Sequence, residues 1–283
     1  MAPPHPIAYQ GSKRQLVPTI LAQLPADTAT LIEPFVGSGA VSLAVAFQQR
    51  AQRFVLGDTL HPLVALWQQL LTEPDVLSDA YAALWHAQLA DPRAHYLMVR
   101  SQFNVRRQPA QLLYLLARCV KNAVRFNAQG EFNQSADHRR LGTRPDQLRA
   151  KIVAASQLLQ GRTQVVAGDY AVLLRQAGPK DVVYMDPPYL GVSQGRDPRY
   201  AQGLDLPRFV DELARANRRG TAYLVSFDGA CGTRTYGPEL PAGLGLQRME
   251  IAVGRSSQAT LLGRSEQTVE ALYLSRGLVG RMG

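Results

Sequence analysis

The chain has too few cysteines for a structure held together by disulfide bonds. It contains two, Cys119 and Cys231, far apart among 283 residues, which excludes a disulfide framework and a cysteine-rich zinc site. The five histidines show no metal-ligand spacing, so we expect no metal. No apolar run approaches the roughly 18 residues of a membrane span, and residues 1–9 lack the features of an export signal. These absences predict a cytoplasmic protein that does not bind a membrane.

Acidic residues are scarce in one stretch of the chain. Between Arg93 and Lys151 there are twelve basic and three acidic residues, which accounts for the whole formal net charge of +9. Elsewhere 19 basic and 19 acidic residues cancel. Concentrated positive charge favours a polyanion such as a nucleic acid, because binding releases counterions from its phosphates. A solvated arginine-rich surface is the alternative interpretation.

Short apolar strands alternate with amphipathic helices in two parts of the chain. The predicted strands are 30–35, 53–58, 163–169, 181–186 and 221–227, and the predicted helices include 40–49 and 206–218. This alternation is typical of a mostly parallel sheet covered by helices on both faces. Two further strands, 246–253 and 268–275, are expected to form an antiparallel pair at one edge.

The alternation is interrupted between residues 61 and 150. The chain there is helical and basic, and it contains a hairpin-like run, Val124–Phe132. We therefore predict that residues 1–60 and 151–283 form one α/β domain. Residues 61–150 would form an inserted domain, with its hairpin near 121–135.

A glycine-rich turn follows the first predicted strand. The run Glu33-Pro34-Phe35-Val36-Gly37-Ser38-Gly39 leads into a helix, and glycines there let the backbone approach a ligand at the helix N-terminus. Ser42 stands where a dinucleotide fingerprint has its third glycine, which disfavours a dinucleotide site. Asp58 ends the second strand about 20 residues later, the usual place for a carboxylate that binds ribose hydroxyls. The alternative is that Asp58 only caps the helix that begins near Leu60.

The motif Asp186-Pro187-Pro188-Tyr189 directly follows another predicted strand. Prolines alone would only stop that strand, since proline lacks a backbone donor. The acid and the aromatic residue indicate chemistry on the exocyclic amine of a base, whose lone pair is delocalised into the ring. The Asp186 carboxylate and the Pro187 carbonyl would accept its N–H groups, and Tyr189 would stack on the base. The amine would then be held in line with an electrophilic methyl group.

The order of these motifs resembles the Dam-type (D12, or alpha class) DNA adenine-N6 methyltransferases over almost the whole chain. The resemblance implies a Rossmann-like α/β sheet for S-adenosylmethionine-dependent methyl transfer, with an inserted, mostly helical target-recognition domain. It implies double-stranded DNA as the substrate and the DPPY motif as catalytic. Besides the glycine turn and Asp58, it implies cofactor contacts from Tyr9-Gln10-Gly11-Ser12-Lys13, from Gly168-Asp169-Tyr170 and from Asp186.

Within the insert, Arg125–Asn133 resembles the recognition hairpin of this family. In the Dam branch an arginine at the position of Arg125 reads a guanine, a geometry suited to O6 and N7. The residues expected to contact DNA are Lys121, Asn122, Arg125, Asn127, Asn133, Arg139 and Arg140. Lys121-Asn122-Ala123 and the residues after Asn133 depart from the Dam pattern, so the recognition sequence stays open.

Three alternative functions stay open at this point. Related proline motifs occur in cytosine-N4 DNA methyltransferases, and DPPY occurs in some ribosomal-RNA guanine-N2 methyltransferases. The third alternative is a silent DNA-binding subunit of a multi-subunit methylase. For a DNA adenine enzyme we expect base flipping, because a paired amine cannot reach a methyl donor inside the duplex. We further expect a monomer or weak dimer associated with the nucleoid, with a cognate restriction endonuclease as a candidate partner.

Overall fold

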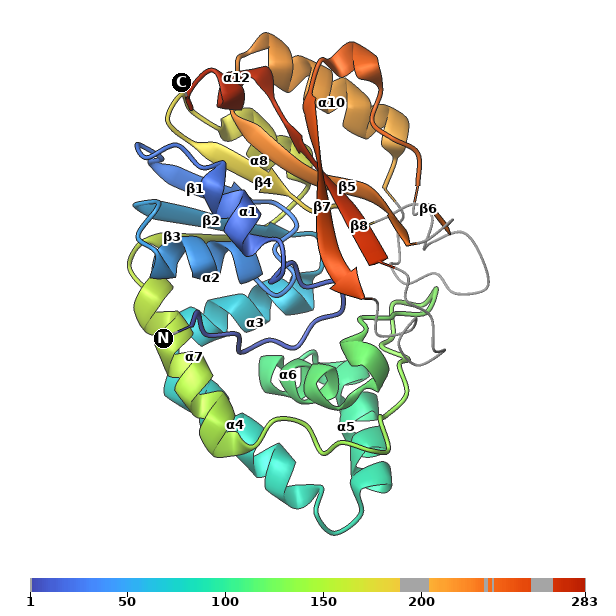
Figure 1. The fold of residues 1–283 in the computed structure, drawn as a ribbon. Helices are drawn as coiled ribbons and strands as arrows, with labels where there is room; N and C mark the ends of the chain where they lie inside the picture. Colours follow the sequence, from blue (N-terminus) through green and yellow to red (C-terminus); the bar gives the residue numbers. More distant parts are fainter. Residues whose placement is uncertain (1, 189–203, 232–233, 236, 256–266, 283) are drawn as a thin grey trace.

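The core of the protein is a twisted, mostly parallel β-sheet (Figure 1). The computed structural model describes residues 2–188, 204–231, 234–235, 237–255 and 267–282. The strands are β1 (Thr30–Glu33), β2 (Arg53–Asp58), β3 (Thr163–Ala167), β4 (Val182–Met185), β5 (Tyr223–Cys231), β6 (Arg234–Thr235), β7 (Gln247–Arg255) and β8 (Gln267–Leu274). Within the described residues they form one sheet in the order β3-β2-β1-β4-β5-β8-β7, and β6 pairs with β5.

The pairing confirms the expected α/β architecture. β1 to β5 run parallel to one another, whereas β8 runs antiparallel to β5 and β7 antiparallel to β8. β2 has the predicted bounds, and the other strands differ from the prediction at their ends. All four residues of β1 and all four of β4 are buried, because helices cover both faces of a parallel sheet.

Helices on the two faces enclose separate apolar cores. Along β4, Val182 and Tyr184 point into the core beneath α1 (Val17–Ala22), α2 (Ala40–Phe47), α3 (His61–Thr72) and α7 (Pro145–Leu159). Val183 and Met185 point the other way, toward α8 (Tyr170–Gln176) and α10 (Leu206–Arg218). This alternation follows from the two-residue repeat of a strand. Two short elements, η2 (Ala242–Leu244) and α12 (Arg276–Val279), complete the carboxyl-terminal part.

The insert is a group of helices below the sheet in Figure 1. Its helices are α4 (Pro74–Ala87), α5 (Pro92–Arg106), α6 (Pro109–Arg118) and the short η1 (Val120–Asn122). α4, α5, α6 and α7 each begin with proline, which presets the backbone and lacks an N–H that the first turn would leave unpaired. No described helix is long and apolar enough to cross a membrane.

The insert and the sheet share one continuous core. α3 contacts β2 and β3 on one side and α4 and α6 on the other, and α7 contacts α2, α3 and α4. Buried side chains therefore continue from β1 through α3 into α6 without a gap. The division at residues 61 and 150 stays a prediction, since α3 and α7 pack against both parts.

Candidate active site

Four carboxylates follow the carboxyl ends of four neighbouring parallel strands. Asp169, Asp58, Glu33 and Asp186 lie at or just after the ends of β3, β2, β1 and β4, which are adjacent in that order. Between β1 and β4 the direction of the chain connections reverses, and such a switch point opens a crevice for ligands in α/β sheets. The fold thus brings all four of these acids, each of which was predicted to contact the cofactor, to one edge of the sheet.

Glu33 is buried and is held by the first turn of α2. Its Oε2 atom accepts hydrogen bonds from the Ser42 backbone N–H, at 3.1 Å, and from the Ser42 hydroxyl. Burial raises the pKa of Glu33 to about 8, although the bonds from Ser42 oppose this effect and nearby Asp186 adds to it. Sequence analysis noted Ser42 only as the residue that replaces a glycine, and it missed this anchoring role.

The glycine turn owes its shape to positive backbone angles and to a tryptophan. Gly37 and Gly39 have φ angles of 46° and 60°, which side chains disfavour. A Cβ atom on Gly39 would lie 2.5 Å from the ring of Trp67. The Trp67 Nε1–H donates to the Gly37 carbonyl at 3.0 Å. The Tyr9 ring also packs here, 3.3 Å from where a Cβ on Gly37 would lie.

Asp58 supports the same turn from β2. Its Oδ2 accepts from the Gly37 N–H at 3.4 Å, and its Oδ1 accepts from the Leu60 N–H at 2.9 Å. Leu60 is the N-cap residue of α3 and the helix has no side-chain cap, so Asp58 contacts the residue before α3 without capping the helix, and a ribose-binding role stays a prediction. Burial raises the pKa of Asp58 to about 6, against the effect of both N–H donors. Pro34 packs beside this strand, with its Cα 3.3 Å from where a Cβ on Gly57 would lie.

Lys13 joins the N-terminal motif to the DPPY strand. Its Nζ lies 3.4 Å from Asp186 Oδ1 and donates to Glu270 Oε2, on β8, at 2.7 Å. Burial raises the pKa of Asp186 to about 6, while Lys13 opposes the shift and Glu270 adds to it. Asp186 is therefore mostly ionised at neutral pH. Glu270 was not among the predicted site residues; the signal for it is a lone acid within the apolar run 269–274.

The N-terminal motif contacts both the sheet edge and the insert. Ser12 Oγ lies 2.9 Å from Ser38 Oγ in the glycine turn, and the Gln10 N–H donates to the Asn122 carbonyl at 2.9 Å. The N-terminal motif thus links both the glycine turn and the DPPY motif to the insert. Tyr189, the last residue of the DPPY motif, lies outside the described residues, and its stacking role stays a prediction.

Aromatic rings connect the glycine turn with the segment after β3. Phe35 and Tyr170 stack with their centroids 5.4 Å apart and their planes at 24°. Asp169 caps α8, since its Oδ1 accepts from the Ala171 N–H at 2.8 Å. The structure therefore brings together Phe35, Asp169 and Tyr170, which were predicted from separate motifs.

The hairpin of the insert forms as predicted from its sequence. Phe126 and Phe132 are paired by an antiparallel bridge, and the Asn133 N–H donates to the carbonyl of half-buried Arg125 at 3.1 Å. The side-chain oxygen of Asn127, Oδ1, accepts from the Glu131 N–H at 2.8 Å. Asn127 thus stabilises the turn, and its predicted contact with DNA is not tested by this geometry.

Asn104 of α5 and Arg107, the residue that follows α5, hold the hairpin in place, and neither was predicted from the sequence. Asn104 bonds both backbone groups of Phe132, at 3.1 and 2.8 Å. Arg107 donates to the Gly130 carbonyl at 2.8 Å, and its guanidinium lies over the rings of Phe103 and Phe126. No motif points to these residues, because their partners are 23 and 28 positions away.

The other predicted DNA-contacting residues differ in exposure. Lys121 and Arg139 are exposed, as is Asn133. Arg140 is also exposed but bonds Asp137, whereas the side chain of half-buried Asn122 donates to the last turn of α6. The exposed residues are available to a partner, while Asn122 has a structural contact.

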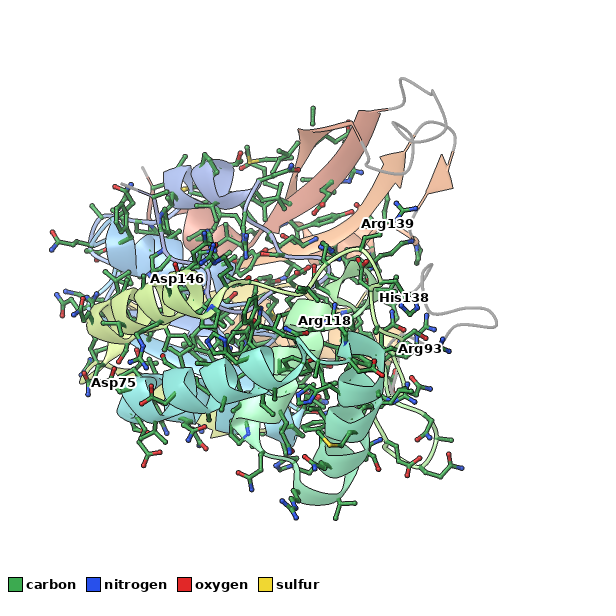
Figure 2. The ribbon with its side chains drawn as sticks, turned by 90° about the horizontal axis from the view of Figure 1, so that it is seen from below. Asp75, Arg93, Arg118, His138, Arg139 and Asp146 are labelled. Atoms are coloured by element: carbon green, nitrogen blue, oxygen red, sulfur yellow. The ribbon has the colours of Figure 1, made fainter. Side chains whose placement is uncertain are left out.

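The residues of the insert that Figure 2 labels fall on two sides. Figure 2 shows Arg93, His138 and Arg139 on one side and Asp75 and Asp146 on the other. Arg144 pairs with Asp146 and Arg149 pairs with Asp75, so the cations of the insert are not confined to the side of Arg139.

Comparison with known proteins assigns the chain to a family. A model of the D12 class N6 adenine-specific DNA methyltransferases matches residues 9–213. The chain belongs to this family. Among its relatives, the DNA N-6-adenine-methyltransferase of Escherichia phage P1 is 30% identical over 234 residues, 78% of this chain and 29% of that protein. The DNA adenine methylase of Vibrio cholerae serotype O1 is 27% identical over 238 residues, 81% of this chain and 82% of that one.

A type II methyltransferase of Lactococcus lactis subsp. cremoris is 26% identical over 195 residues, 66% of each chain. The chain thus spans less than a third of the phage relative and about two thirds of the lactococcal one. Membership of the D12 family confirms the resemblance drawn from the motif order. The family match includes the N-terminal motif, the glycine turn, the insert and DPPY, but not Glu270.

Proposed function

We propose that this D12 family member transfers the methyl group of S-adenosylmethionine to the N6 amine of an adenine flipped out of double-stranded DNA. The observation that carries the proposal is the meeting of Asp186, Lys13 and Glu33 at the switch point between β1 and β4. This edge combines a glycine turn for a ligand with the acid expected to accept from an amine.

The residues at the sheet edge fit S-adenosylmethionine. Asp58 Oδ2 accepts from the Gly37 N–H at the long distance of 3.4 Å, and a carboxylate has about four lone-pair sites, so acceptor capacity remains for a ribose hydroxyl. Asp169 and Tyr170 follow β3, three strands along the sheet from β4 and Asp186, a separation that suits the adenine and methionine ends of the molecule, and Phe35 stacks on Tyr170 from the end of β1. When bound, S-adenosylmethionine supplies an electrophilic methyl group.

The chain's own contribution is to hold the target amine with its lone pair exposed. The ionised Asp186 carboxylate and the Pro187 carbonyl accept the two N–H groups, which favours tetrahedral character at the nitrogen. Lys13 beside Asp186 favours the charged form of this acid. No general base is required before transfer, because positioning in line with the methyl group supplies most of the rate. The methylated nitrogen then loses one proton to the Asp186 carboxylate or to water.

The insert supplies the contacts that keep a base out of the duplex. Extrusion costs a few kcal/mol of stacking and pairing energy. Phosphate contacts from exposed basic residues such as Lys121 and Arg139 offset this cost and set the register, and Arg125 on the hairpin supplies base readout. The type II relatives support a cognate restriction endonuclease as a partner, and we keep a monomer or weak dimer on the nucleoid as the expected state.

The test is methyl transfer from isotope-labelled S-adenosylmethionine to unmethylated genomic DNA and, separately, to RNA, followed by nucleoside analysis. We expect N6-methyladenine in DNA, at positions that share a short motif. N4-methylcytosine in DNA would establish the cytosine alternative, and label in RNA alone would overturn the proposal. Binding of DNA without any transfer would identify a silent subunit.

A further inference from the structure

Arg208, on α10, bonds both carboxylate oxygens of Asp169, the acid expected to contact the adenine of the cofactor. Arg208 Nη1 donates to Asp169 Oδ2 and Arg208 Nη2 donates to Asp169 Oδ1, both at 2.9 Å. Such a two-pronged contact fixes the plane of a carboxylate, which otherwise rotates broadly about its last torsion. No sequence motif singled out Arg208, and its partner is 39 positions away.

The same guanidinium also lies against the aromatic residues of this region. The Arg208 Cζ atom is 5.5 Å from the centroid of the Tyr170 ring, a distance at which a cation is attracted to the ring face. Tyr170 in turn stacks on Phe35 and meets the edge of Phe209. The orientation of Arg208 is therefore set by two independent contacts, one ionic and one aromatic.

The Asp169 carboxylate keeps one acceptor site for a ligand. A carboxylate offers about four lone-pair sites. At Asp169, Oδ1 accepts from the Ala171 N–H and from Arg208, whereas Oδ2 accepts from Arg208. One site remains on Oδ2, and it can only accept. Such a site binds a purine that carries an amine at position 6 and repels one that carries a carbonyl there.

We propose that Arg208 is a positioning residue that fixes Asp169 as a single, oriented acceptor for the 6-amino group of the cofactor's adenine. The inference rests on the proposed use of S-adenosylmethionine and adds the residue that sets selectivity for its base. Without the guanidinium, Asp169 would keep the bond from the Ala171 N–H, but its remaining lone pair would be less firmly aimed at the 6-amino group, and its preference for that group would weaken.

The test compares two ligands that differ only at purine position 6: S-adenosylhomocysteine and S-inosylhomocysteine. Their dissociation constants are measured by calorimetry for the wild type and for Arg208→Gln, Arg208→Lys and Arg215→Gln. Arg215 is the matched control, because it lies on the same helix, is exposed and bonds Glu212 rather than Asp169. Thermal melting shows whether each variant is folded.

We expect the wild type to prefer the adenosyl ligand by at least about tenfold, the size of one charged hydrogen bond. Arg208→Gln should reduce that ratio severalfold without abolishing it, because the carboxylate itself remains; Arg208→Lys should reduce it less, since one ammonium cannot bond both oxygens in plane, and Arg215→Gln not at all. An unchanged ratio in a folded Arg208→Gln, or no preference in the wild type, would overturn the inference. If the wild type bound neither ligand, the proposed cofactor itself would be wrong.

Discussion

The sheet edge and the insert use charge in opposite ways. At the sheet edge the ionisable side chains are mainly acidic and are buried or half-buried against specific partners, as Glu33 is against Ser42 and Asp186 against Lys13. In the insert the charges are basic, and many of them are exposed. Burial gives the first region altered pKa values, whereas exposure leaves the second a surface that salt can screen.

Some arginines of the insert stabilise its structure, whereas others are exposed on its surface. Arg118 is 2% exposed and donates to the Asp137 carbonyl at 2.9 Å, and Arg149 pairs with Asp75 and Asp79 of α4. Arg107 holds the hairpin turn. A net charge counted from the sequence therefore overstates the number of cations that face a partner. The exposed residues on the side of Arg139 are the ones expected to meet DNA.

The largest effect is expected at the sheet edge, from Asp186→Ala. Removing the acceptor for the target amine should lower the rate of methyl transfer by about 10²–10³-fold or more. Binding of S-adenosylmethionine should persist, since the glycine turn and Asp58 are unchanged. Single-turnover transfer measures the first quantity and equilibrium dialysis the second. Transfer at the wild-type rate would remove Asp186 from the mechanism.

A second prediction concerns the buried state of Glu33. Burial makes the folded protein bind this proton more tightly than the unfolded chain, so wild-type stability falls as the pH rises from about 4.5 to about 8. Glu33→Gln keeps an oxygen for Ser42 but cannot ionise. Relative to the wild type, the free energy of unfolding of Glu33→Gln should rise by on the order of 3 kcal/mol as the pH rises over this range. Urea unfolding at several pH values measures the difference, and a difference constant with pH would contradict the assigned burial.

The sheet edge was the more predictable of the two regions. A buried strand ending on an acid or on a glycine turn is a local pattern, and the parallel arrangement then gathers the ends of β1, β2, β3 and β4. β2 was located to the residue for this reason, and α10 because its apolar residues recur with the period of a helix. The contacts that hold the acids were not predictable, because Lys13 reaches Asp186 and Arg208 reaches Asp169 from distant segments.

The sequence predicted that the hairpin exists, but not which residues hold it in place. The turn at 127–130 is a local signal, whereas Asn104 and Arg107 come from a helix that carries no motif. Likewise, the sequence distinguishes an arginine from a leucine but not a buried Arg118 from an exposed Arg139. That distinction depends on which carbonyls the fold brings within reach.

The third prediction tests readout by the hairpin. Arg125→Ala should lower discrimination at one base pair of the recognition sequence by about 1–3 kcal/mol, the usual value of a two-pronged contact to guanine. Competition between oligonucleotides that differ at single positions measures this, once the methylated motif is known. A uniform loss on every sequence would instead identify Arg125 as a phosphate contact.

The smallest effects should separate exposed from structural arginines. Arg139→Gln should weaken DNA binding a few-fold on all sequences and reduce the slope of log K against log salt by about 1, as expected for one lost phosphate contact. Arg149→Gln is the matched control, because its guanidinium faces Asp75 and Asp79. It should leave the slope unchanged and cost at most about 1 kcal/mol of stability. Equal slopes for both variants would mean that the division of the insert into two sides does not govern DNA binding.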